Sequence, residues 1–573
     1  MRKNERKFYD STCSYIILLF VFSVLIIVPF MLVNQLGVHS DWSFHSARVQ
    51  QIYLNLKRGQ LFTFIGTDTF SKVGNANFLF YPSVFLYPWA LLKFIFKPVE
   101  AFLIYSWLLT FVTMLVSYFC MLAYRKNKLT AFFFAIIYAI VPYHFYLTLG
   151  NYVLGEAQAY MFIPVVLLGM YRVLNNRGWK TLGIGITLEM YCHLVSTFIS
   201  IEVCGILFLV WLCFSHSLNW RVLINICKAV ALYFVLSAWL LVPLATDYFR
   251  KGLTKPGAGF MLTKDLGDYI VGCINNLPSN TGGLGLLLVV ILLFGWKWCR
   301  KGTSDIYVYL VGVLIVIMIT STFPWQWFKS TPLAIIQFPY RYTSFAACFL
   351  AIIGSIGATS LVAHVSRKTV TGILITIALF SLCFGETYTL VARNHNSDGS
   401  VEVLKGSRQG HYKTLRSASD TPIIITNKTY NDQFSYGALY GETDYFPQRS
   451  SDSAKTVLNR RAYMDGHQIK FSQHSKPNQL IYVVNAKKAG LVDLPALVYS
   501  HSLVKVNNNR QAVKTSSRGA LLVHVRQGRN VVSFTYKPAA VYYLLMIVAT
   551  IAWVGLAYGG YRDKSKLTVR NQV

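Results

Sequence analysis

Long apolar segments recur along the whole chain and are separated by short polar loops. A helix needs about 20 mainly apolar residues to cross the hydrocarbon core of a bilayer, and many of these segments approach that length. We predict about 12 spans, near residues 15–33, 101–123, 129–148, 158–174, 181–198, 199–214, 222–245, 283–296, 305–321, 342–362, 369–385 and 539–558. The pattern is therefore that of a polytopic α-helical membrane protein.

Basic residues gather in alternate loops, and they fix the predicted orientation. They lie at 125–128, 177–180, 297–301 and 367–368, and in a tail at 562–570. Cytoplasmic loops carry an excess of Lys and Arg, so we assign these loops and both termini to the cytoplasm. The assignment leaves the apolar run 78–96 on the outer side as a re-entrant or interfacial helix. It also requires two spans within 181–214, with a turn near 193–197.

Two long polar segments interrupt the apolar pattern, and both fall on the predicted outer side. The first is a loop over about 34–100, and the second covers about 386–538. The later part of the second segment alternates apolar and polar residues as strands do, for example over 479–484 and 531–536. We therefore predict a transmembrane part over 1–385, an extracellular β-sandwich-like domain over 386–538, and a last helix with a basic cytoplasmic tail over 539–573.

Composition agrees with a membrane protein. Apolar residues make up 54% of the chain, charged residues only 13%, and the mean hydropathy is +0.44, whereas soluble domains carry about 25% charged residues. A soluble globular enzyme and a disordered chain are excluded. The net charge of +31 needs no nucleic acid partner, because loop orientation explains it. The ten cysteines have no zinc-binding spacing, and the second polar segment contains none.

Ionisable residues at the outer ends of the spans are the candidates for chemistry, because a charge at membrane depth is costly. They are Asp41, His45, Arg48, Glu156, His193, Asp247, Arg250, Lys251 and Arg341. If 41–48 is helical, Asp41, His45 and Arg48 share one face. A carboxylate, an imidazole and a guanidinium placed so can perform acid–base chemistry and hold a phosphate.

Four of these candidates also have a structural interpretation. Asp41 has the position of a helix N-cap, and Glu156 has that of a capping carboxylate. Arg341 follows aromatic residues as an interfacial anchor does. His193 is alone on an apolar segment, as a packing histidine is, although Glu189 and Glu202 nearby indicate a buried polar network.

Several common cofactor motifs are absent from the sequence. It has no P-loop, no Rossmann glycine fingerprint and no HExxH motif, so an ATP-driven pump within this chain is not supported. No DxD pair occurs either, and the nearest match is the single Asp68. We predict neither a divalent metal nor another cofactor.

Several short motifs are spread over nearly the whole chain. They are Asp41-x-x-Phe44-His45-x-x-Arg48, Phe80-Tyr81-Pro82, Gly155-Glu156, Cys192-His193-Leu194, Gln337-Phe338-Pro339-Tyr340-Arg341 and the stretch 493–499. This arrangement resembles the GT-C superfamily of polytopic glycosyltransferases. More narrowly, it is similar to bacterial membrane proteins labelled YfhO-like or 6-pyruvoyl-tetrahydropterin synthase-related. The pterin label would imply a zinc enzyme with clustered histidines, which the sequence does not support.

The resemblance implies transfer of a sugar from a polyprenyl-phosphate donor at the outer face of the bacterial plasma membrane. The acceptor would be a cell-surface polymer or glycolipid, such as teichoic acid or another wall polysaccharide. It implies catalytic roles for Asp41, His45 and Glu156, and supporting roles for His193 and Gln337. Donor phosphate would bind Arg341, Arg48, Arg250 and Lys251, because cationic side chains bind phosphate. Close relatives would have a basic residue before Glu156, and residues 149–154 contain none.

Two other functions stay open. One is a transporter or flippase for a lipid-linked saccharide, and the other is an inactive membrane protein that binds glycan. Transporters show internal repeats and interrupted helices near the membrane midplane. Here the polar candidates gather at one face and no repeat is evident, which favours the transferase.

Overall fold

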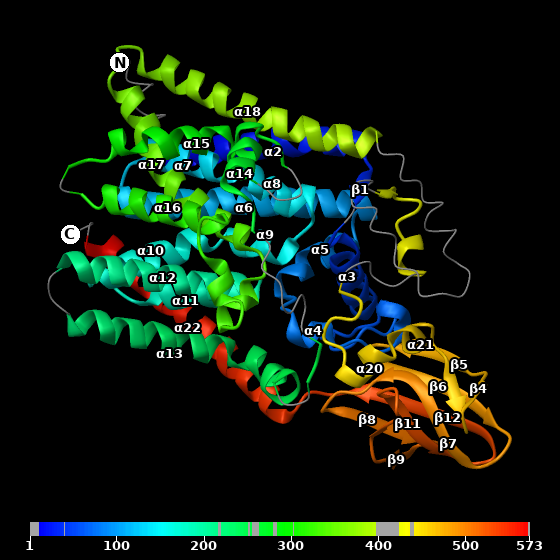
Figure 1. The fold of residues 1–573 in the computed structure, drawn as a ribbon. Helices are drawn as coiled ribbons and strands as arrows, with labels where there is room; N and C mark the ends of the chain where they lie inside the picture. The colour runs from blue at the N-terminus through cyan, green and yellow to red at the C-terminus, as the bar shows by residue number, and fades with distance from the viewer. Residues whose placement is uncertain are drawn as a thin grey trace.

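The computed structural model of the chain describes residues 11–38, 40–215, 219–249, 252–254, 263–278, 283–301, 303–396, 423–435 and 441–570. Helices lie side by side in one bundle, and a β-rich part lies beyond one of its ends (Figure 1). We call this end of the bundle the β-domain end. The opposite end carries the basic loops at 126–127, 175–179 and 299–301, and we call it the basic end.

The bundle is built from helices of very different lengths. They are α2 (Thr12–Val33), α6 (Pro98–Arg125), α7 (Lys128–Ala139), α8 (Pro142–Phe145), α9 (Leu154–Tyr160), α10 (Ile163–Leu174), α11 (Lys180–Met190), α12 (Leu194–Ser215), α13 (Trp220–Pro243), α14 (Leu266–Ile274), α15 (Gly285–Phe294), α16 (Asp305–Ile319), α17 (Thr343–Ala363), α18 (Lys368–Asn396) and α22 (Ala540–Arg570). Short helical turns extend several of them, including η3 (Tyr146–Gly150), η4 (Leu244–Tyr248), η5 (Gly295–Trp298), η6 (Trp325–Phe328), η7 (Pro332–Ile336) and η8 (Pro339–Tyr342).

Within the described residues, seven helices are long and apolar enough to cross a membrane. Two further pairs, α7 with α8–η3 and α9 with α10, are bent by 53° and 41°, which raises the number to as many as nine. Pro142 and Pro164 stand in the first turn after each bend, where a missing backbone N–H is tolerated. The structure therefore confirms a polytopic helical protein.

The predicted number of about 12 spans is not confirmed. Helices form at all the predicted positions, but α11, α15 and α16 have only 11, 10 and 15 residues. Within 181–214 the chain breaks at Tyr191–His193 rather than at 193–197, so α12 alone is a full-length span of 22 residues. Apolar composition indicates which segments are embedded, but helix breaks decide how many cross.

The loop after α2 folds into short elements at the β-domain end. It contains β1 (Leu36–Val38), α3 (Trp42–Lys57), η1 (Phe70–Lys72), α4 (Asn77–Phe80), η2 (Val84–Leu86) and α5 (Tyr87–Leu92). The apolar run 78–96 is thus divided among short helices and forms no span, as predicted. Strand β1 pairs with the distant β2 (Ile423–Ile425), which ties the loop to the chain that follows α18.

The β-domain consists of two five-stranded antiparallel sheets that share one apolar core. One sheet has the order β10-β11-β7-β3-β4 and the other β5-β6-β12-β8-β9. The strands are β3 (Ala462–Met464), β4 (His467–Ile469), β5 (Ser472–Lys476), β6 (Gln479–Ala486), β7 (Gly490–Leu497), β8 (Ser502–Val506), β9 (Asn509–Gln511), β10 (Lys514–Thr515), β11 (Ala520–Val525) and β12 (Gly528–Tyr536). The predicted β-rich part before the last helix is confirmed. Short helices η9 (Asp432–Ser435), α20 (Gln448–Asp452) and α21 (Ala454–Leu458) precede it.

The first loop and the β-domain are packed as one unit. Phe64, Ile65 and Phe80 of the loop belong to the same apolar core as the sheets. Asn478 accepts a hydrogen bond from the Phe64 N–H at 2.7 Å and donates one to the Phe62 carbonyl at 2.7 Å. The β-domain therefore fixes the position of the loop that carries Asp41.

Candidate active site

The centre of the candidate site is a largely buried ion pair at the β-domain end of the bundle. Arg341 lies in η8, directly before α17, and its Nε is 3.6 Å from Oε2 of Glu156 in α9. The Arg341 Nη1 donates to the Ile336 carbonyl at 2.6 Å and to Gln337 Oε1 at 3.3 Å. Both charged groups are thus held in fixed orientations inside a mostly apolar protein.

The carboxylate of Glu156 is bound from other helices as well. Its Oε1 accepts hydrogen bonds from the Tyr143 hydroxyl at 2.6 Å and from the Ser344 hydroxyl at 3.4 Å. Glu156 is 3% exposed and lies in the first turn of α9. Three side chains, rather than backbone N–H groups of its own helix, are the partners found for it. The geometry is that of a positioned functional group more than of a helix cap.

Asp41 lies beside this pair, at the N-terminus of α3. It occupies the N-cap position, yet its side chain makes no capping hydrogen bond. Burial raises the pKa of Asp41 to about 6, the positive charge of Arg341 opposes this rise, and the negative charge of Asp444 adds to it. Asp41 therefore lies within electrostatic range of both the ion pair and a second carboxylate. The sequence alone did not predict either interaction.

Asp444 is contributed by the segment that leads into the β-domain. This half-buried carboxyl also has a pKa raised to about 6 by burial. Its segment is seated directly on α3, because a Cβ at Gly441 would be 2.6 Å from the Phe44 ring. Sequence analysis missed Asp444, since nothing local distinguishes it within a long polar stretch.

His45 and His193 both lie against the Tyr81 ring. The ring centroids of both histidines are 5.7 Å from that of Tyr81. His45 is 1% exposed and its Nδ1 has no hydrogen-bond partner among the described residues. Burial, and then the charges of Arg48 and His193, hold the pKa of His45 well below its usual value, so the ring is neutral.

His193 has a local structural role. Its Nδ1 lies 2.9 Å from the Ser196 hydroxyl and accepts from the Ser196 N–H at 3.3 Å. It therefore caps the first turn of α12, as a side chain that accepts a backbone N–H does. His193 thus lies next to the site, and its hydrogen-bonding partner is Ser196.

Arg48 is expected from the sequence to bind the donor phosphate, but the structure buries it fully. Its guanidinium is 0% exposed, and Nη2 donates to the carbonyls of Tyr81 and Pro82 at 2.7 and 2.8 Å. It also lies over the Tyr81 ring, 4.7 Å from the centroid. These contacts fasten the loop at Tyr81–Pro82 to α3, which is a positioning role.

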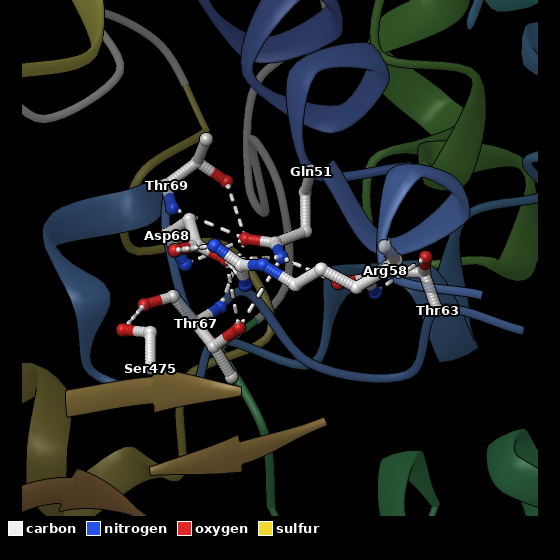
Figure 2. A network of polar contacts seen from close by, with 8 residues as sticks. Gln51, Arg58, Thr63, Thr67, Asp68, Thr69 and Ser475 are labelled. Atoms are coloured by element: carbon white, nitrogen blue, oxygen red, sulfur yellow. Dashed lines mark hydrogen bonds and ion pairs between the residues drawn. The ribbon is translucent and has the colours of Figure 1, made fainter. Parts of the chain in front are cut away.

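A polar network at the C-terminal half of α3 fixes residues 67–69 (Figure 2). Gln51 Oε1 accepts from the backbone N–H groups of Thr67, Asp68 and Thr69 at 2.9, 2.7 and 3.1 Å. Arg58 binds the Asp68 carboxylate with two nitrogens at 2.7 and 3.1 Å. Asp68 is thereby occupied by Arg58, and Figure 2 shows Ser475 of the β-domain reaching the same loop.

Other predicted residues are placed away from the ion pair or outside the described part of the chain. Asp247 is buried in η4, where Oδ1 accepts from the Ser500 N–H at 2.6 Å and so anchors the β-domain. Arg250 and Lys251 lie outside the described residues. Glu202 accepts from the Tyr342 hydroxyl at 2.7 Å, whereas neither carboxylate oxygen of the buried Glu189 has a hydrogen-bond partner among the described residues.

The basic residue that the sequence lacks before Glu156 is supplied from a distant helix. Arg393, near the end of α18, donates from Nη2 to the carbonyls of Leu149 and Gly150 at 3.1 and 3.0 Å. No local motif could reveal this, because the two segments are more than 240 residues apart. A cation is thus present next to 149–154 after all.

A resident metal centre is not evident in the described part of the chain. No group of three or more His, Cys, Asp or Glu side chains there is arranged to hold a metal ion.

A family model and solved structures both match this chain. A family model described as "6-pyruvoyl-tetrahydropterin synthase related domain; membrane protein" matches residues 78–389, more than half of the chain. A structural comparison aligns 71% of this chain with 61% of the Archaeoglobus fulgidus oligosaccharyltransferase in its apo form, at a TM-score of 0.36 and 12% sequence identity. No curated protein sequence matches the chain.

Proposed function

We propose that this chain, which belongs to the 6-pyruvoyl-tetrahydropterin synthase-related family of membrane proteins, is a GT-C-type glycosyltransferase. It would move a sugar from a polyprenyl-phosphate donor to a cell-surface polymer or glycolipid at the outer face of the plasma membrane. The family match confirms the family that the sequence motifs predicted, and its description names no reaction of this chain.

The observation that carries the proposal is the buried Arg341–Glu156 pair beside Asp41. An arginine held by a carboxylate and by a backbone carbonyl is already oriented before a ligand arrives, which favours tight binding of a phosphate. A carboxyl with a pKa near 6 is well suited to accept a proton near neutral pH. Both groups lie at the end of the bundle that the basic loops predict to be external.

The chemistry follows from these two roles. Asp41 accepts the proton of an acceptor hydroxyl as the oxygen of that hydroxyl attacks the anomeric carbon of the donor sugar. The bond from that carbon to the phosphate oxygen breaks, and the phosphate leaves with the electron pair. Arg341 stabilises the negative charge that grows on the leaving phosphate. Glu156 keeps the guanidinium of Arg341 in place, and His45 and Gln337 line the same region.

The test compares sugar transfer by variants at equal membrane levels. Asp41→Asn and Arg341→Gln should each reduce addition of sugar to isolated wall polymers and glycolipids by at least roughly 10²-fold. Matched controls are Asp452→Asn and Lys329→Gln, which remove the same charges from exposed side chains. Transfer that survives in both site variants would refute the proposal, and the glycan that changes in the wild type would identify the acceptor.

A further inference from the structure

A cavity of about 810 Å³ lies in the half of the bundle nearer the basic end, and neither Arg341 nor Glu156 lines it. Its walls are mainly apolar and come from α6, α7, α10, α12, α16 and α17, with Met121, Phe134, Leu167, Leu207 and Phe349 among the lining residues. The volume falls within the range of about 300–1,000 Å³ that small-molecule and cofactor sites occupy. The cavity is therefore large enough for a ligand.

Apolar side chains of α12 and α16 that are exposed at the surface of the bundle also line the cavity. Helix α12 packs on α10 and α11, whereas α16 packs on α17, and the two groups meet where α10 packs on α17. Phe214 of α12 and Ile306 of α16 both line it and are 56% and 36% exposed. Apolar side chains exposed on membrane helices face lipid, so an occupant would enter from the bilayer rather than from water.

The end of the cavity nearest the basic loops is polar and cationic. Arg125, Asn175, Thr303 and Ser304 line it there. Arg125 forms an ion pair with Asp305, which Arg300 also contacts at 3.3 Å, so two guanidinium groups share one carboxylate. The Nε of Arg125 is buried and has no hydrogen-bond partner among the described residues. A buried donor without a partner is costly, and an anionic oxygen would satisfy it.

We propose that this cavity binds a membrane phospholipid with an anionic headgroup. An acyl chain would lie between α12 and α16, and the phosphate would lie at Arg125. Basic pockets between transmembrane helices are known to take such headgroups. The site differs from the proposed donor site, because its polar end is at the opposite end of the bundle from Arg341. It does not depend on the proposed transferase activity.

The experiment measures lipid bound to the purified full-length protein by native mass spectrometry. The probes are phosphatidylglycerol and phosphatidylcholine with identical acyl chains, each added to delipidated protein. Val210→Trp fills the cavity, because Val210 lines it. Leu209→Trp is the matched control, since Leu209, which precedes Val210 on the same helix, is 60% exposed and does not line the cavity. Wild type and Leu209→Trp should retain phosphatidylglycerol, and its occupancy on Val210→Trp should be at least tenfold lower.

Two further arms make each outcome decisive. Arg125→Gln should reduce the preference for phosphatidylglycerol over phosphatidylcholine at least tenfold, and it also decides the matter if Val210→Trp is not recovered folded. Equal retention of phosphatidylglycerol by Val210→Trp and Leu209→Trp would show that the lipid does not bind in this cavity. Equal binding of the two phospholipids by the wild type would show that the site does not select an anionic headgroup. Retention of polyprenyl phosphate by delipidated protein that retains neither phospholipid would show that the occupant is not a phospholipid.

Discussion

The hydroxyl of Tyr81 lies against the backbone of Gly155, so closely that a Cβ at position 155 would be 2.1 Å from the hydroxyl oxygen. Tyr81 belongs to the loop that carries Asp41, and Gly155 directly precedes Glu156 in α9. The contact therefore sets the distance between the two halves of the candidate site. Only a residue without a side chain fits there.

Gly155→Ala should disturb this contact and displace either Tyr81 or the first turn of α9. We expect a loss of about 1–3 kcal/mol of stability from overpacking and a fall in transfer of roughly 10²-fold from misplacement of Glu156. The double variant Gly155→Ala/Tyr81→Phe removes the closest atom and should recover part of both losses. Thermal unfolding and sugar transfer measure them, and no recovery in the double variant would contradict the contact.

Transfer should rise with pH around a midpoint near 6. Burial raises the pKa of Asp41 to about 6, and a general base works only when it is deprotonated. The carboxylate of Asp444 contributes to that rise, so Asp444→Asn should move the midpoint to lower pH. Profiles of kcat/KM against pH test this, with Asp452→Asn as the control. An unmoved midpoint in Asp444→Asn would show that the two carboxyls do not interact.

Lys93 should make the stability of the chain depend on pH. Its ammonium donates to Gln50, lies 4.6 Å from the Tyr430 ring centroid and forms no ion pair among the described residues. Burial lowers the pKa of Lys93 to about 7.

The sign of this dependence follows from proton binding. The unfolded chain holds a proton on Lys93 up to about pH 10, whereas the folded chain loses it above about 7, so stability rises with pH between these values. Lys93→Met should flatten the rise in Tm between pH 7 and 9, whereas the exposed Lys97→Met should not. A rise of unchanged steepness in Lys93→Met would argue against a buried ammonium.

Gln51→Leu should destabilise the first loop, because three backbone N–H groups lose their shared acceptor. A buried donor left unsatisfied costs about 1–3 kcal/mol, so we expect a total loss of at least about 2 kcal/mol. Gln60→Leu, outside the network, is the control. Chemical unfolding in detergent measures the difference, and equal stability of the two variants would rule out a structural role for Gln51.

Helix periodicity predicted the shared face of Asp41, His45 and Arg48, and α3 does form there. It could not predict depth or partners. Asp41 is half-buried beside Arg341, whereas Arg48 is fully buried against the carbonyls of Tyr81 and Pro82. A pattern of period 3.6 reports which residues point the same way, and the rest depends on what the other elements bring against that face.

The contributions from far along the chain were beyond sequence analysis for the same reason. Asp444 reaches the site because its segment packs on Phe44, and the course of α18 brings Arg393 to residues 149–150. Neither residue stands in a motif. The span number also eluded prediction, because hydropathy does not show that the chain breaks at Tyr191–His193 and leaves α11 too short.

The common core of the first loop and the β-domain has a consequence for biosynthesis. Phe64 leaves the ribosome 414 residues before Asn478, the residue that binds its backbone. At roughly 5–20 residues per second, this loop waits on the order of 20–80 s for its partner. Every span but the last is already made by then, so the helices can enter the membrane long before the site around Asp41 exists. A ribosome that stalls before the β-domain would leave an inserted but inert protein.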